Sequence, residues 1–323
     1  MNTFGRKFRV SIFGESHGPY TGITIDGCPP GISINNDDFT TDINRRKTGA
    51  KGTSKRLEDD IPIIISGVFN GYTTGAPITI IFGNKNIESD SYSDYKHLPR
   101  PGHADYTAKI KYKGYNDYRG SGHFSGRLTL PVVAAGVIAK KIIQPVNISA
   151  KITELYGNKN LNEAIKKAEE LNDSIGGIIE CKIKGLKAGY GEPFFDSLES
   201  LISHAIFAIP AIKGIEFGAG FKVSQMTGSE NNDAIIDKNG TTSTNHAGGI
   251  NGGISNGNEI IFRVAVKPAS STPKAQSSYN FETNKVESFS IKGRHDLCIA
   301  LRVPVIVEAV TSIVIADLMI IDK

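Results

Sequence analysis

The chain has 323 residues, 39% of them hydrophobic and 22% charged, a balance typical of folded globular proteins. Its net charge of +4 fits an anionic small ligand, but it is too weak to indicate a nucleic acid or a membrane surface as partner. The three cysteines, Cys28, Cys181 and Cys298, lie far apart and are odd in number, which favours a reducing, cytoplasmic compartment.

Six runs rich in Ile, Val and Phe, each bounded by Gly, Pro, Asn or Asp, predict β-strands. They are 7–13, 22–26, 62–69, 77–82, 177–183 and 258–266. Two segments also echo each other, because ITIDGCPPGIS (23–33) and ECKIKGLKAGYGEP (180–193) both run from a strand into a G-x-x-x-G turn. The echo indicates either two similar halves stacked on one core or a coincidence, and the residues alone leave both open.

Helical spacing of apolar residues predicts four helices, at 126–143, 160–172, 196–209 and 304–320. In the third of these, Asp196 and Glu199 match a capping box and Pro210 marks the end. No low-complexity linker divides the chain, so residues 1–323 are expected to form one α+β domain.

The most apolar stretch, 303–321, carries Pro304, Glu308 and Asp317. These polar residues favour a buried helix over a membrane span. The first residues, MNTFGRKFRVSIFGES, lack the apolar core of a signal peptide, which again favours a cytoplasmic protein.

Five of the seven histidines fall in polar runs that also contain glycine. They are His17, His103, His123, His246 and His295. Histidine titrates nearest to neutrality, so several histidines in polar loops suit proton transfer. Each of them could instead only satisfy the hydrogen bonds of its own turn.

Arginines accompany these runs, and their planar guanidinium groups match phosphate and carboxylate. Arg45, Arg46 and Lys47 precede a glycine, and Arg100, Arg119, Arg127, Arg294 and Arg302 flank the histidine runs. The alternative for the RRK cluster is a solvated charged face. Residues 267–272, KPASST, follow a strand and could hold a phosphate through Lys267, Ser270 and Ser271.

Several familiar motifs are absent from the sequence. It has no Walker A pattern, no G-x-G-x-x-G after a strand, no H-E-x-x-H and no G-x-S-x-G. Nucleotide binding by those loops, a metal site and a serine hydrolase are therefore disfavoured. The residues alone indicate a cytoplasmic enzyme that handles a multiply anionic small molecule with histidine acids and bases, and they do not reveal a flavin.

Five motifs, in order and at sensible spacing from about residue 4 to about 315, together resemble the chorismate synthase family. They are FGESHG (13–18), RPGHADYTAKIKYKGYNDYRGSGHFSGR (100–127), NHAGGINGGISNG (245–257), KPASS (267–271) and KGRHD (292–296). The resemblance implies a β-α-β sandwich and a homotetramer. It also implies reduced FMN as cofactor and 1,4-anti elimination of phosphate from 5-enolpyruvylshikimate 3-phosphate to give chorismate, the last common step toward the aromatic amino acids.

The resemblance also carries residue roles onto matching positions. His17 resembles the acid that assists departure of the phosphate, and His103 resembles the proton donor to the reduced flavin. Asp296 resembles the acidic residue near flavin N5 that takes up or relays the C6 proton, with Ser16 as its neighbour in that relay.

The resemblance implies two sets of binding residues, and the spacing of possible metal ligands in the sequence predicts no metal. The flavin contacts would be His123, Phe124, Ser125, Ala211, Gly252, Lys267, Pro268, Ala269, Ser270, Ser271 and Arg294. Contacts to the substrate or to NADP would come from Arg46, together with Arg45, Lys51, Arg100 and Arg127. Nothing indicates a flavin-reductase domain, so reduced FMN is expected from a separate flavin reductase.

The sequence departs from the family pattern at several places, among them three near the expected site. HFSGR (123–127) stands where many members have RSSAR, Pro210 stands where asparagine is common, and the loop around 47–56 is short. Two alternatives stay open on the residues: a flavin- or phosphate-dependent enzyme of another reaction, and a module that binds RNA with a strong salt dependence.

Overall fold

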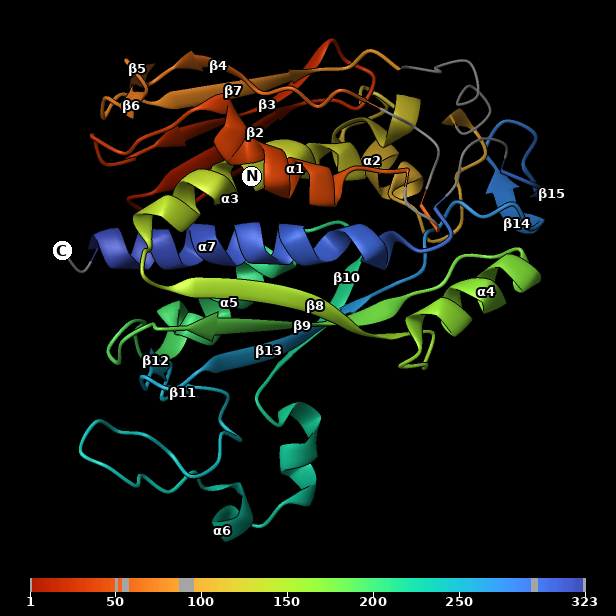
Figure 1. The fold of residues 1–323 in the computed structure, drawn as a ribbon. Coiled ribbons are helices and arrows are strands. Elements are labelled where there is room, and N and C mark those ends of the chain that lie inside the picture. Colours follow the sequence, from red (N-terminus) through yellow and green to blue (C-terminus); the bar gives the residue numbers. More distant parts are fainter. Residues whose placement is uncertain (1, 50–51, 54–57, 87–95, 292–295, 322–323) are drawn as a thin grey trace.

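Two antiparallel sheets enclose a layer of helices (Figure 1). The structure is a computed structural model that describes residues 2–49, 52–53, 58–86, 96–291 and 296–321. One sheet has the order β1 (Thr3–Phe4), β2 (Arg9–Gly14), β3 (Tyr20–Asp26), β7 (Ile78–Gly83) and β4 (Ile63–Ser66). The other has the order β10 (Ile212–Phe217), β13 (Ile260–Val266), β9 (Gly177–Lys184) and β8 (Asn147–Leu155).

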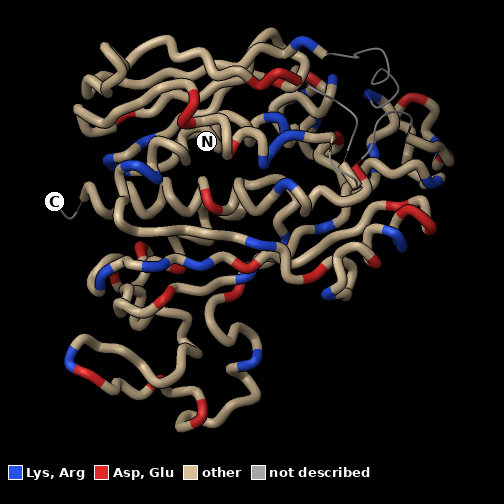
Figure 2. Tube along the Cα trace, in the orientation of Figure 1, with Lys and Arg blue, Asp and Glu red and all other residues tan. Residues whose placement is uncertain are grey.

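Helices and three small hairpins accompany the two sheets in the described part of the chain. The helices are α1 (Thr40–Arg46), α2 (Asp105–Lys111), α3 (Thr129–Ile142), α4 (Leu161–Leu171), α5 (Leu198–Ile206), α6 (Gly228–Asn231) and α7 (Val303–Ile321). The hairpins are β5 (Val68–Phe69) with β6 (Tyr72–Thr73), β11 (Ile250–Asn251) with β12 (Ile254–Ser255), and β14 (Gln276–Asn280) with β15 (Lys285–Phe289). The segment with α6 projects from the second sheet (Figure 1). Lys, Arg, Asp and Glu are interspersed along the chain in this view, in keeping with the mild net charge (Figure 2).

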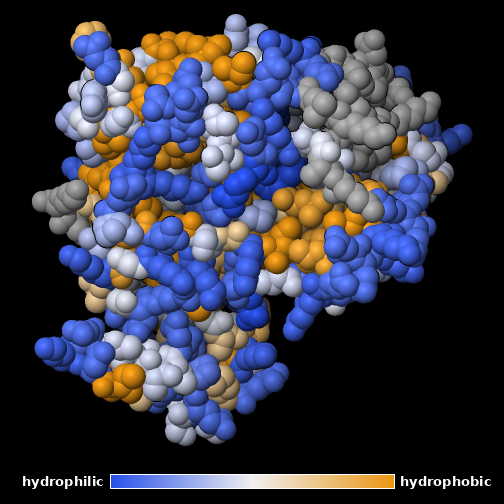
Figure 3. Space-filling view, viewed as in Figure 1, coloured by the Kyte–Doolittle hydropathy of each residue, from blue (hydrophilic) through white to orange (hydrophobic). Residues whose placement is uncertain are grey.

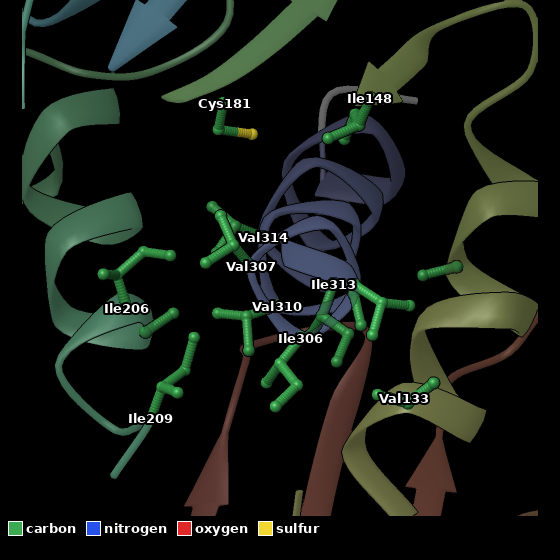
Figure 4. Packing of buried hydrophobic residues seen from close by; sticks show 14 of the residues in the cluster. Val133, Ile148, Cys181, Ile206, Ile209, Ile306, Val307, Val310, Ile313 and Val314 are labelled. Carbon is green, nitrogen blue, oxygen red and sulfur yellow. The ribbon is translucent and has the colours of Figure 1, made fainter. Parts of the chain in front are cut away.

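Helix α7 runs between the two sheets and forms the centre of the core (Figures 1 and 4). It is apolar on all sides, as a fully buried helix must be, and it packs against α3, α5 and β8. Val307, Val310 and Val314 point toward Ile206 and Cys181, whereas Ile313 lies toward α3 (Figure 4). Helix α3 comes so close that a Cβ on Gly136 would lie 2.3 Å from the Cβ of Ala309.

The polar groups of α7 are all held by partners, which explains how so apolar a helix carries two acids. The Glu308 carboxylate accepts two hydrogen bonds of 2.7 Å from Arg45, one of 2.9 Å from Lys140, and one of 2.9 Å from the Ala150 backbone N–H. Asp317 accepts hydrogen bonds from the backbone N–H groups of residues 6–8. The prediction of a buried helix is confirmed: the stretch Ile299–Ile321 is long and apolar enough to cross a membrane, but 78% of its most apolar window is buried in the fold.

All six predicted strands are present, with one correction. The run 62–69 is not continuous, because Gly67 takes a φ of +81° and separates β4 from β5. Strands β8 and β10 had no prediction, although β8 alternates exposed and buried residues along NISAKITEL. The polar residues of this strand make its apolar alternation too weak to predict a strand from the sequence.

The four predicted helices are also present, within a few residues of their expected bounds. The capping box predicted for the third is wrong. Ser197 caps α5 by accepting a 3.1 Å hydrogen bond from the Ser200 N–H. Asp196 instead pairs with Arg6, since the chain enters the helix one residue later than the pattern indicates.

The G-x-x-x-G echo has a conformational counterpart in the two sheets. It follows β3 in one sheet and β9 in the other, and both are interior strands. The four glycines 27, 31, 185 and 189 all have φ between +78° and +110°. The sheets differ in strand number, however, and two similar halves therefore remain a prediction.

Candidate active site

A cavity of about 1220 Å³ is lined from both sheets and from the helices between them. The residues before α2 and before α3 contribute to it, as do the segment after β13 and the C-terminal end of α5. Val303, Ile306, Val310 and Ile313 of α7 form part of its wall and are apolar.

The lining carries an excess of positive charge. Among the described residues it contains seven lysines and arginines and three acidic residues. The arginines at positions 46, 100 and 127 are each at most 7% exposed. Buried guanidinium groups beside an apolar wall suit a ligand that combines an apolar ring with anionic groups.

Ser16 and His17 lie directly after β2, with both side chains buried in the cavity wall. The Ser16 backbone N–H donates to the Gly122 carbonyl at 3.0 Å, which fixes this turn against the glycine-rich run 119–124. The Ser16 hydroxyl is buried and has no hydrogen-bond partner among the described residues. A buried hydroxyl of this kind is available to a ligand group.

Arg100, His103 and Asp105 form one ion-paired cluster at the start of α2. The Arg100 guanidinium donates to Asp105 through Nε at 2.7 Å and Nη2 at 2.8 Å. The Nδ1 atom of His103 lies 2.7 Å from Asp105 Oδ1, and its Nε2 lies 3.0 Å from the Ser121 hydroxyl. This partnered histidine is held in one orientation inside the cavity lining.

Burial and charge act on the two titrating groups of this cluster. Burial lowers the pKa of His103, and the nearby charge of Arg100 adds to that effect, while Asp105 opposes it. Burial alone would raise the pKa of Asp105, but hydrogen bonds from Arg100 and His103 hold that pKa well below its usual range. Asp105 is therefore an anion, and His103 favours the neutral form, at neutral pH.

Asp60 joins two of the buried arginines. Its carboxylate lies 3.4 Å from Arg46 Nη1 and makes a short ion pair with Arg127 Nη1. Arg46 also donates to the Gly126 carbonyl, and Arg127 donates to the Asn84 side chain at 2.9 Å. One buried acid thus sets the position of two cations in the cavity wall.

The KPASS segment, 267–271, packs against the residues around His103. Lys267 Nζ and the Ser270 hydroxyl both donate to the Gly102 carbonyl, at 2.6 Å and 2.7 Å. Ser271 accepts a 3.2 Å hydrogen bond from Arg100. Burial and the nearby Lys213 charge lower the pKa of Lys267.

The run HFS, 123–125, and Ala211 also line the cavity. His123 Nδ1 donates to the Gly14 carbonyl at 2.7 Å, since a carbonyl oxygen can only accept. The Ser125 hydroxyl caps the short helical turn 126–128. Ala211 takes a left-handed φ of +74°, and its carbonyl accepts from the Lys267 N–H at 2.9 Å.

The structure gathers most of the residues that the sequence singled out. The cavity lining contains Ser16, His17, Arg46, Arg100, His103, His123, Phe124, Ser125, Arg127, Ala211, Lys267, Pro268, Ala269, Ser270, Ser271 and Asp296. Asp296 is held by a short ion pair with Arg302.

Four of the residues to which the family resemblance gives a role are not placed there. Arg45 binds Glu308 in the core, and Gly252 lies in the β11–β12 turn, outside the lining. Lys51 and Arg294 lie outside the described residues. No cluster of three or more His, Cys, Asp or Glu side chains suited to a metal occurs in the described part of the chain.

Sequence reasoning missed three contributors to the site: Asp60, the pairing role of Asp105, and Ser121. Asp60 follows a polar stretch, and nothing in the sequence links it to two distant arginines. Ser121 stands between two glycines in RGSGHF, and a single serine in a glycine-rich run gives no signal of a functional side chain.

A helix-and-sheet sandwich with a large, cation-lined, histidine-bearing cavity is typical of an enzyme that acts on a small molecule. The family is shown by sequence comparison, in which the chorismate synthase family profile matches residues 8–320. The chain therefore belongs to the chorismate synthase family, whose members are lyases.

The similarity extends over whole chains. The chorismate synthase of Chitinophaga pinensis is 59% identical over 324 residues, covering 100% of this chain and 98% of the relative. That of Dehalococcoides mccartyi strain BAV1 is 45% identical, covering 98% and 96%. That of Thermococcus gammatolerans is 40% identical, covering 97% and 96%. A crystal structure of a chorismate synthase superimposes with a TM-score of 0.76 at 22% identity, over 99% of this chain and 93% of that one, and confirms the mixed fold.

Proposed function

We propose that this chain eliminates phosphate from 5-enolpyruvylshikimate 3-phosphate, in the presence of reduced FMN, to give chorismate. The observation that carries the proposal is the cavity itself, where three buried arginines and four histidines, His17 and His103 among them, meet an apolar wall. The substrate and the flavin each combine a ring with anionic groups, so both need cations beside apolar surface.

The residues present fit a reduced flavin. The cavity volume exceeds the usual size for one drug-sized ligand and leaves room for a cofactor beside a substrate. Lys267 and the KPASS hydroxyls offer donors to a phosphate, whereas Phe124 and the α7 wall offer apolar contact. When bound, reduced FMN supplies electron density to the reacting ring and recovers it, so that no net redox change occurs.

Anionic groups of the substrate are assigned to Arg46, Arg100 and Arg127. Asp60 and Asp105 already hold these guanidinium groups in place, so binding does not have to order three flexible side chains. Guanidinium groups provide the planar N–H donors that desolvated phosphate and carboxylates require.

Proton handling is assigned to the histidines and the acid that line the same cavity. His17 donates a proton to the departing phosphate, with Ser16 beside it. His103 controls the proton on the bound flavin, and Asp296 receives or relays the proton lost from C6. His17 and His103 lie in different surroundings within the cavity wall, as mechanisms that use two acids require.

The test is an anaerobic assay of the purified protein with chemically reduced FMN and 5-enolpyruvylshikimate 3-phosphate. Chorismate and phosphate should appear in equal amounts, and neither should appear with oxidised FMN. Phosphate release without chorismate would refute the proposed reaction.

Three further expectations complete the proposal. A homotetramer would cover hydrophobic patches such as the one over the first sheet, where Ile63 and Ile65 are 46% and 57% exposed (Figure 3). A separate flavin reductase would supply reduced FMN. A cytoplasmic, reducing location suits the three cysteines, all buried as free thiols.

A further inference from the structure

Ser121 is the serine of the run RGSGHF and holds an unusual backbone conformation beside His103. Its φ of +72° lies in the left-handed region that favours glycine, and Gly120 and Gly122 on either side have positive φ as well. A serine held in this region at a functional site indicates that its side chain has a use there. The side chain lines the cavity.

The Ser121 hydroxyl stands between Arg100 and His103. Its Oγ lies 3.3 Å from Arg100 Nη2 and 3.0 Å from His103 Nε2. A guanidinium N–H can only donate, so Oγ accepts from Arg100. The hydroxyl hydrogen is then free to point at Nε2.

At the other ring nitrogen of His103, Nδ1, one contact requires a hydrogen and another requires a lone pair. Asp105 Oδ1, 2.7 Å from Nδ1, requires a hydrogen on that nitrogen. The Asp105 backbone N–H, 3.2 Å away, requires a lone pair there instead. Arg100 Nη2 is also 3.2 Å away, but its two hydrogens are directed to Asp105 Oδ1 and the Ser121 hydroxyl. Nδ1 alone therefore does not fix the tautomer, and the contact at Nε2 decides it.

We propose that Ser121 is a positioning residue whose hydroxyl donates to Nε2 and holds neutral His103 as the Nδ1–H tautomer. Asp105 then receives the Nδ1 hydrogen, and the basic lone pair stays on Nε2, beside Ser121 in the cavity wall. The importance of this tautomer for turnover rests on the proposed function. The tautomer itself does not, so it is measured on the full chain without flavin or substrate.

The experiment records imidazole ¹⁵N and ¹³C signals of histidine-labelled protein at a pH where His103 is neutral, with His103→Gln to assign its signals. The wild-type chain should show His103 as Nδ1–H. Ser121→Gly and Ser121→Ala should both lose that single-tautomer pattern and give a mixture with Nε2–H. Glycine takes the required φ without strain, so Ser121→Gly should fold.

Asn70→Gly is the matched control, because Asn70 also has positive φ (+50°) but lies in the exposed β5–β6 turn. It should leave the His103 signals unchanged. An Nε2–H tautomer in the wild type would overturn the proposal, as would an unchanged pattern in both Ser121 variants or an equal change in Asn70→Gly. Each result can be read whether or not the protein makes chorismate.

Discussion

The backbone of Gly120 lies against the imidazole of His17. A Cβ built on Gly120 would lie 2.3 Å from His17 Cδ2 and 2.4 Å from Nε2, far inside van der Waals contact. Gly120 also takes a φ of +54°. The glycine is therefore required twice, for its conformation and for the space that the His17 ring occupies.

We expect Gly120→Ala to displace His17 and lower chorismate formation by about 10²-fold, the scale set by small misplacements of catalytic groups. The control is Gly114→Ala, which has a φ of +80° but nothing within 4 Å of the added methyl group. Its backbone strain should lower the midpoint of thermal unfolding by a similar amount, while its turnover should stay normal. Equal turnover in the two variants would show that His17 does not depend on this contact.

Replacing Asp60 by asparagine should destabilise the protein, because Arg46 and Arg127 would remain buried without their shared anion. Losing one partner of a buried ion pair typically costs about 3–5 kcal/mol. Urea unfolding measures the loss. Asp59→Asn removes an exposed neighbouring carboxylate that pairs with Lys85, and it should leave the unfolding free energy nearly unchanged. Similar curves for the two variants would rule out a special role for Asp60.

His103→Ala should fold and still bind FMN but lose about 10²–10⁴-fold in turnover, the usual contribution of a general acid or base. His97→Ala is the control, since His97 lies outside the cavity lining. Steady-state rates with reduced FMN provide the comparison. Full activity without the His103 imidazole would remove this residue from the mechanism.

Lys267→Met should weaken FMN binding by about 10–100-fold, because a hydrogen bond to a charged group contributes about 1.5–3 kcal/mol. Lys274→Met tests the same substitution on the same stretch of chain, at a lysine that pairs with Asp173 outside the cavity. Fluorescence titration with FMN gives both dissociation constants. An unaltered constant for Lys267→Met would argue against its contact with the flavin phosphate.

Glu308 should make stability depend on pH in the acidic range. Burial alone would raise its pKa, but the Arg45 hydrogen bonds and the Lys140 charge hold that pKa below its ordinary value of 4.5. A lowered native pKa adds stability above the ordinary pKa, and this stability is lost as the pH falls through the native value. Glu308→Gln should cost about 1–3 kcal/mol at neutral pH, less than a fully buried pair because Arg45 and Lys140 are partly exposed.

The difference in unfolding free energy between wild type and Glu308→Gln should therefore narrow as the pH is lowered below about 4.5, the ordinary pKa of this carboxyl group. Chemical unfolding at several pH values measures it. Glu282→Gln, at an exposed loop position, should follow the wild type throughout. A gap that stays constant into strong acid would contradict the proposed charge pairing.

Elements with a strong periodic signal, and the residues proposed for the chemistry, can be read from the sequence. Helix α7 is apolar on every side, and only a buried position suits such a helix. The polar, glycine-bearing runs around His17, His103 and His123 met at one cavity, because glycine permits tight loops whose side chains converge on a ligand.

Which acidic side chain pairs with which arginine follows only from the tertiary structure. Asp60 pairs with Arg46, 14 residues away, and with Arg127, 67 residues away, and no local pattern encodes such contacts. Arg45 and Arg46 are adjacent in sequence, yet one binds Glu308 in the core and the other lines the cavity. Successive helical residues point about 100° apart, so only the packing around α1 decides which arginine faces the cavity.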